Sequence, residues 1–181
     1  MYNSKKSLWE KDVYPDAYNV IIVGGGIVGL NTAIELKEED SNLEILIIER
    51  GFIPIGASTR NAGFACFGSP SEILADLEEQ NEQEVIETIQ MRWGGLKKLK
   101  QRVGSDNMSF KSNGSYELFD EETEELYQSA SDQLNRLNSM LKYVIGENVF
   151  EHADHRIIDY GLKETRHLIF NKYEGQLHPG K

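Results

Sequence analysis

The sequence predicts an α/β protein: a βαβ unit with parallel strands, followed by part of an α+β domain. Three observations predict this class. A β-branched run at 18–23 stops at three glycines, a helical pattern of apolar residues follows at once, and a second β-branched run occupies 43–49. The chain has 181 residues, 39% of them hydrophobic, which is enough to bury one sizeable core or two small ones.

The first 17 residues are polar and mixed, and we expect them to form an arm that leads into the domain. The run from Tyr18 to Val23 is compact and β-branched, the pattern of a parallel strand buried on both faces. From Ile27 to Glu39 apolar residues recur at steps of three and four, which predicts an amphipathic helix. The run from Leu43 to Glu49 is then a second strand, parallel to the first because a helix connects them.

The segment from Arg50 to Ser71 is rich in glycine and proline, and we expect a long irregular loop there rather than another helix. Loops of this length inside compact domains usually carry a function. From Ser71 to Val103 an apolar stripe predicts a helix, broken near the polar pair Gln80-Asn81.

The remaining elements are shorter or less regular. Asn113-Gly114 lies between two short apolar runs, 108–110 and 116–119, which is the signal of a β-hairpin. The pattern over 120–145 predicts another amphipathic helix, and strand-like runs at 156–160 and 167–170 close the chain. In that helix the residues expected to face inward are Leu126, Ala130, Leu134, Leu137, Leu141 and Val144.

Charge and composition exclude several classes of protein. Nineteen Lys and Arg against thirty Asp and Glu give a net charge of −11, the wrong sign for coating a phosphate backbone, so we expect no nucleic-acid partner. No apolar run is long enough to span a bilayer, and the start of the chain lacks the apolar stretch of a signal peptide. Cys66 is the single cysteine, and no Cys/His group has zinc spacing. We therefore expect a cytoplasmic protein without a transmembrane segment or a metal site.

Gly24, Gly26 and Gly29 satisfy the pattern G-x-G-x-x-G between the predicted strand and helix, a context that makes an otherwise weak motif specific. Gly24 permits the tight turn, Gly26 lets a pyrophosphate approach the backbone, and Gly29 lets helix and strand pack closely. The diphosphate would lie at the positive end of the helix, with Ile27 and Val28 contributing backbone amides. The pattern favours a Rossmann-like dinucleotide site over a glycine-rich turn that binds nothing.

Glu49 ends the second predicted strand, twenty residues after Gly29, where a carboxylate accepts hydrogen bonds from an adenosine ribose 2′-hydroxyl. A 2′-phosphate would meet it as a like charge, so NADP is disfavoured. NAD and FAD share this half-site. Three features favour FAD: the motif lies near the start of the chain, Arg50-Gly51 follows the acid, and a loop of small residues comes next.

That loop runs from Gly56 to Phe64. The hydroxyls of Ser58 and Thr59, the amide of Asn61 and the close backbone at Ala62-Gly63 suit a phosphate and a flat ring system. On spacing alone, an ordinary surface loop is an equal alternative.

Together, residues 19–30, 49–51 and 56–63 resemble the D-amino-acid-oxidase-type family of FAD-dependent oxidoreductases, which includes glycine, sarcosine and glutamylputrescine oxidases. The resemblance is strong over 18–70 and weak over 71–170, and the end of the chain resembles the turn where such chains return to the FAD domain. It divides the sequence into an arm at 1–17, an FAD-binding portion at 18–80, part of a substrate domain at 81–170 and a return segment at 171–181.

The resemblance implies an enzyme that oxidises the C–N bond of a small amine or amino acid by hydride transfer to FAD. Glu49 would hold the adenosine ribose, Arg50 would flank the adenine, and 58–63 would line the pyrophosphate and the near edge of the flavin. Members that bind FAD covalently often use a histidine in this loop; Thr59-Arg60-Asn61 stands here, which implies non-covalent binding. Family members are longer and generally carry their substrate-binding Arg and Tyr in the second half, so no catalytic residue is assigned.

Two other interpretations stay open. One is a flavoenzyme of the same fold that acts on an alcohol, in the manner of glycerol-3-phosphate dehydrogenase; no residue of this sequence separates that from an amine oxidase. The other is a non-catalytic fragment that binds the ADP half of a dinucleotide. A yellow protein that amines reduce in the absence of oxygen would support the amine oxidase and exclude both of these alternatives.

Overall fold

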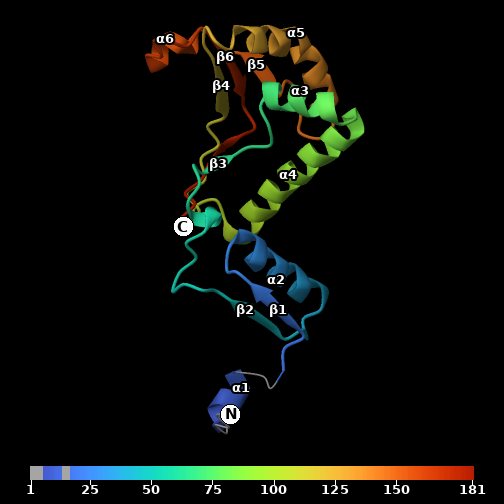
Figure 1. Ribbon diagram of the computed structural model, residues 1–181, viewed down its shortest axis with the longest axis vertical. Helices are drawn as coiled ribbons and strands as arrows, with labels where there is room; N and C mark the ends of the chain where they lie inside the picture. Colours follow the sequence, from blue (N-terminus) through green and yellow to red (C-terminus); the bar gives the residue numbers. More distant parts are fainter. Residues whose placement is uncertain (1–5, 14–16) are drawn as a thin grey trace. The chain divides into compact units, whose positions relative to one another are not determined.

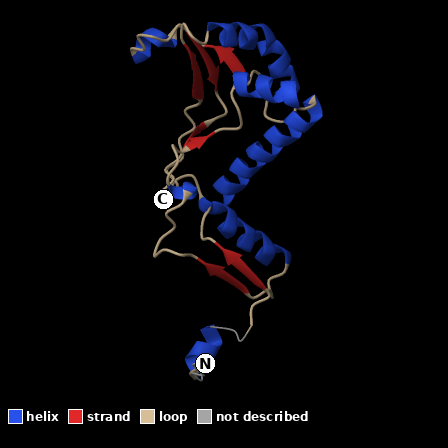
Figure 2. Ribbon diagram, in the orientation of Figure 1, coloured by secondary structure: helices blue, strands red, loops and turns tan. Residues whose placement is uncertain are grey.

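The computed structural model describes residues 6–13 and 17–181, and Figures 1 and 2 show its elements. Part of the predicted arm, 1–5 and 14–16, lies outside the described residues; the rest includes a short helix, α1 (Leu8–Val13). The chain divides into two compact units, 1–61 with Gly180 and 62–179 with Lys181. That division falls inside the predicted 18–80 portion, and the domain limits stay a prediction. No helix in the described ranges is both long and apolar enough to cross a membrane.

The first unit contains the predicted βαβ arrangement. Strand β1 (Val20–Val23) leads to helix α2 (Ile27–Glu39) and strand β2 (Ile45–Ile48), and the two strands pair in parallel. The prediction that β1 is buried on both faces is wrong for this chain: Val23 is 84% exposed and Ile21 57% exposed. The physical reason is that α2 packs against a pair of only two described strands, which leaves apolar side chains of both strands in contact with solvent.

The loop expected after β2 is irregular, as predicted. It contains a single 3₁₀ turn, η1 (Ala57–Thr59), in the first unit. The second unit opens with a two-residue strand, β3 (Phe64–Ala65), which pairs antiparallel with β7 (Gly175–Gln176) near the end of the chain. This pairing ties the end of the loop to the predicted return segment.

Two helices follow, α3 (Pro70–Glu79) and α4 (Glu82–Val103), and the predicted break at Gln80-Asn81 is confirmed. Each helix begins with a capping box. Ser69 and Glu72 close the first turn of α3, while Asn81 and Glu84 do the same for α4. The break is therefore stabilised by Asn81, whose side chain accepts a hydrogen bond from the amide of Glu84.

The core of the second unit lies between these helices, α5 (Glu124–Leu141) and a three-stranded antiparallel sheet. The sheet order is β4 (Ser115–Phe119), β6 (His167–Asn171), β5 (Phe150–His152), visible together in Figure 1. Of the inward residues predicted on α5, Leu126 is wrong: it is 49% exposed, and Tyr127 is buried in its place. The fully buried side chains of this core include Phe67, Ile73, Val85, Ile89, Leu137, Leu141, Phe150 and Ile169.

The predicted hairpin around Asn113-Gly114 is wrong. Residues 105–109 form turns, and β4 pairs with the distant strand β6. Gly114 has a φ of +73°, and a Cβ there would come within 2.2 Å of the Phe170 ring. The glycine therefore allows a close approach between chain segments rather than a hairpin turn.

The run 156–160, predicted as a strand, is a short helix, α6 (Arg156–Tyr160). The carbonyls of Ala153 and Asp154 accept the first amides of this turn, and Gly161 ends it in the left-handed conformation with φ +65°. The apolar residues at 157 and 158 give the run a strand-like composition. The glycine that follows ends the turn in the left-handed conformation, which is typical of the end of a helix. The strand predicted at 167–170 is confirmed as β6.

Gly114→Ala is expected to lower the free energy of unfolding by about 2–3 kcal/mol, because the new methyl group meets Phe170 in a packed site. Gly161→Ala is the matched control: it has a similar φ, but a Cβ there meets nothing within 4 Å, so backbone strain alone should cost about 1 kcal/mol. Urea denaturation of the two variants measures the difference. Equal losses would contradict the packing role of Gly114.

Candidate dinucleotide-binding site

The glycine motif lies where β1 ends and α2 begins, as predicted. Gly24 has a φ of +108°, which side chains other than glycine rarely adopt. A Cβ on Gly29 would lie 2.1 Å from the Gly24 carbonyl oxygen, and one on Gly26 would lie 2.8 Å from Ser58 Oγ. All three positions thus require glycine: Gly24 for the turn, Gly29 for the packing of the helix against the strand, and Gly26 for the approach of a second group to the backbone.

The start of α2 has backbone amides that can bind an anion. Its N-cap, Gly26, provides no side-chain hydrogen bond to the first turn. The Ile27 amide donates to Ser58 Oγ at 2.9 Å, so a loop hydroxyl occupies the place that the acceptor oxygen of a ligand would take or share. The positive end of the helix and the nearby hydroxyl together favour a phosphate.

Glu49 directly follows β2, and its carboxylate faces the glycine turn. One oxygen accepts from the Gly25 amide at 2.8 Å and the other accepts from the Gly51 amide at 3.2 Å. These two hydrogen bonds, first Gly25 and then Gly51, lower the pKa of Glu49 below its ordinary value, so it is ionised at neutral pH. Each oxygen retains a lone pair that can accept from a ligand hydroxyl.

A pocket brings these features together within the first unit. Among its lining residues are five predicted from the sequence: Gly24, Gly26, Glu49, Arg50 and Ser58. Sequence reasoning missed the other five residues of the wall: Val23, Ile48, Pro54, Gly56 and Ala57. Val23 and Ile48 belong to the two predicted strands, and Gly56 and Ala57 to the run 56–63 that carries the family resemblance, whereas Pro54 was signalled only by its place in a loop expected to be functional.

Other predicted residues lie elsewhere. The side chains of Ile27 and Val28 are 47% and 77% exposed, which agrees with a role for their amides alone. Thr59 Oγ1 donates to the Pro54 and Gly56 carbonyls, and Asn61 Nδ2 donates to those of Ala57 and Ser58, so both side chains stabilise the loop itself. Their contact with a cofactor stays a prediction.

Ala62 and Gly63 belong to the second unit. Gly63 has a φ of +74°, and a Cβ on it would lie 2.2 Å from the Leu177 carbonyl oxygen. Its own carbonyl accepts from the Leu177 amide at 2.8 Å. Gly63 thus packs against the segment 171–181, and its predicted contact with the flavin stays a prediction.

In a comparison with protein-family models, residues 19–181 match DAO, described as "FAD dependent oxidoreductase". A search of curated proteins finds no match. Solved structures match with a probability of 1.00, among them glycine oxidase from Bacillus cereus ATCC 14579, L-proline dehydrogenase from P. horikoshii and iminodiacetate oxidase from Chelativorans sp. BNC1.

These three likenesses are in fold. The identities are 16%, 22% and 15%, and the TM-scores are 0.55, 0.56 and 0.57, respectively. The matches cover 91%, 91% and 88% of this chain but only 42%, 39% and 41% of the solved ones. The chain thus spans about two fifths of the length of the structures it matches. The likeness in fold confirms the predicted fold class.

Proposed function

Because this chain belongs to the DAO family of FAD-dependent oxidoreductases, we propose that it is the cofactor-binding N-terminal part of an enzyme that oxidises the C–N bond of a small amine or amino acid. The names of the matched structures support the substrate class, since they denote oxidation of glycine, L-proline and iminodiacetate. The proposal includes FAD bound without a covalent link and a hydride transfer from the substrate.

The observation that carries the proposal is the pocket of the first unit. At Gly26 the absence of a Cβ, which would meet Ser58, exposes the backbone of the glycine turn. The N-terminal end of α2 favours a phosphate, and the ionised carboxylate of Glu49 lines the same pocket. These residues fit the adenosine diphosphate part of FAD: the glycine turn would hold the pyrophosphate and Glu49 the ribose hydroxyls.

When bound, FAD supplies a ring that accepts a hydride from the substrate carbon attached to nitrogen, leaving an imine. The part of this chain in that chemistry is to bind and orient. Glu49 is fixed by the amides of Gly25 and Gly51, so it presents its remaining lone pairs without reorganisation. Ser58, held against the Ile27 amide, would position the loop beside the pyrophosphate.

The experiment is anaerobic reduction of the whole enzyme that contains this chain, after incubation with FAD. We expect glycine, sarcosine or another small amine to bleach the flavin absorbance, while glycerol 3-phosphate leaves it unchanged. Bleaching by glycerol 3-phosphate alone would replace the amine by an alcohol substrate. Stable FAD binding with no reduction by either class would contradict the proposed oxidation and leave a protein that only binds the cofactor.

A further inference from the structure

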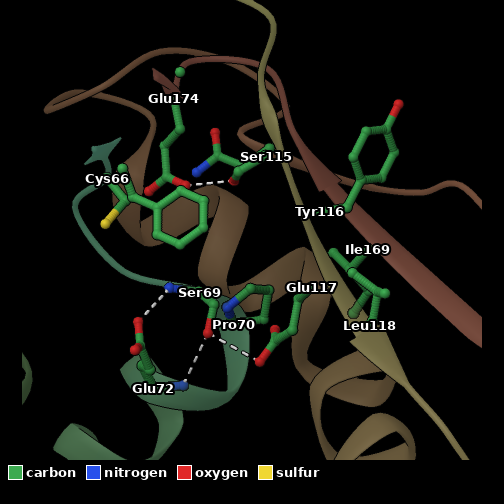
Figure 3. Close-up of a pocket in the computed structure, with 13 residues that line it drawn as sticks. Cys66, Ser69, Pro70, Glu72, Ser115, Tyr116, Glu117, Leu118, Ile169 and Glu174 are labelled. Carbon is green, nitrogen blue, oxygen red and sulfur yellow. Dashed lines mark hydrogen bonds between the residues drawn. The ribbon is translucent and has the colours of Figure 1, made fainter. Parts of the chain in front are cut away.

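We draw no further inference here: the strongest candidate, the pocket of the second unit that Glu72, Glu117 and Glu174 line (Figure 3), rests on a cluster of acidic residues for which no second observation in the described part of the chain points to a ligand.

Discussion

Gly26→Val is expected to abolish measurable FAD binding, with a loss in affinity of about 100-fold or more, equivalent to about 2.8 kcal/mol. A Cβ at this position would already lie 2.8 Å from Ser58 Oγ, and the two methyl groups of valine would fill the space against the turn. The amides at the helix end could then donate neither to the Ser58 hydroxyl nor to a pyrophosphate. Isothermal titration of the purified variant with FAD measures the effect.

The control for this variant is Gly95→Val in α4. A Cβ on Gly95 meets nothing within 4 Å, and valine is a better helix residue than glycine, so stability should hold or rise and FAD affinity should not change. Far-UV circular dichroism would show whether Gly26→Val is folded. FAD binding that survives in a folded Gly26→Val protein would mean that the glycine turn is not the phosphate site.

Glu174→Ala is expected to lower the free energy of unfolding of the second unit by about 3 kcal/mol or more. Glu174 is 3% exposed and joins three distant donors: the amides of Phe67 and Gly68 and the hydroxyl of Ser115. Without the carboxylate these buried donors have no acceptor, and each costs about 1–3 kcal/mol. Urea denaturation followed by circular dichroism gives the value, and a loss below about 1 kcal/mol would contradict this role.

The charge of Glu174 adds a pH dependence with a defined sign. Burial raises its pKa in the folded protein above the ordinary value of 4.5, so the folded state binds the proton more tightly than the unfolded state. The stabilisation of the folded protein that arises from this difference in pKa is therefore fully present below pH 4.5. It is lost as the pH rises through the pKa of Glu174 in the folded protein. Glu174→Gln keeps an acceptor oxygen and should remove this dependence; an unchanged pH profile would contradict it.

Much of the first unit could be predicted from local sequence. The helix Ile27–Glu39 has the predicted bounds, and the parallel pair on either side of it follows from a short helical crossover. The burial of β1 could not be predicted in the same way. β-branched composition indicates a strand suited to a two-sided core, but whether both faces are covered depends on other parts of a fold.

The errors in the second unit have two different causes. The Asn113-Gly114 pair predicts a local turn, whereas the conformation of Gly114 serves the packing of Phe170, more than fifty residues later, and no local pattern contains that information. Tyr127, next to the expected Leu126, lies at helical spacing from the buried residues Ala130 and Leu134, and its ring stacks on His167 at a centroid distance of 3.8 Å. Periodicity therefore allowed either residue to face inward, and the packing partner shows which one does.

The two pockets also differ in how far local sequence could predict them. Glycine spacing and the strand-ending acid were sufficient to place Gly24, Gly26 and Glu49 in one pocket, since backbone geometry near a βαβ turn is local. The pocket of the second unit shown in Figure 3 is lined by Asn171 and Glu174 from the end of the chain and by Glu72 of α3. No sequence motif joins these residues, so only the folded chain shows that they line one cavity.

We propose that the pocket of the first unit holds the adenosine diphosphate part of FAD. Titration of the purified chain with FAD, FMN and ADP tests this assignment, because FMN has the flavin but lacks the adenosine. We expect FAD to bind, ADP to compete with it, and FMN neither to bind nor to compete. Binding of FMN as tight as that of FAD, with no competition by ADP, would mean that this pocket does not hold the adenosine diphosphate.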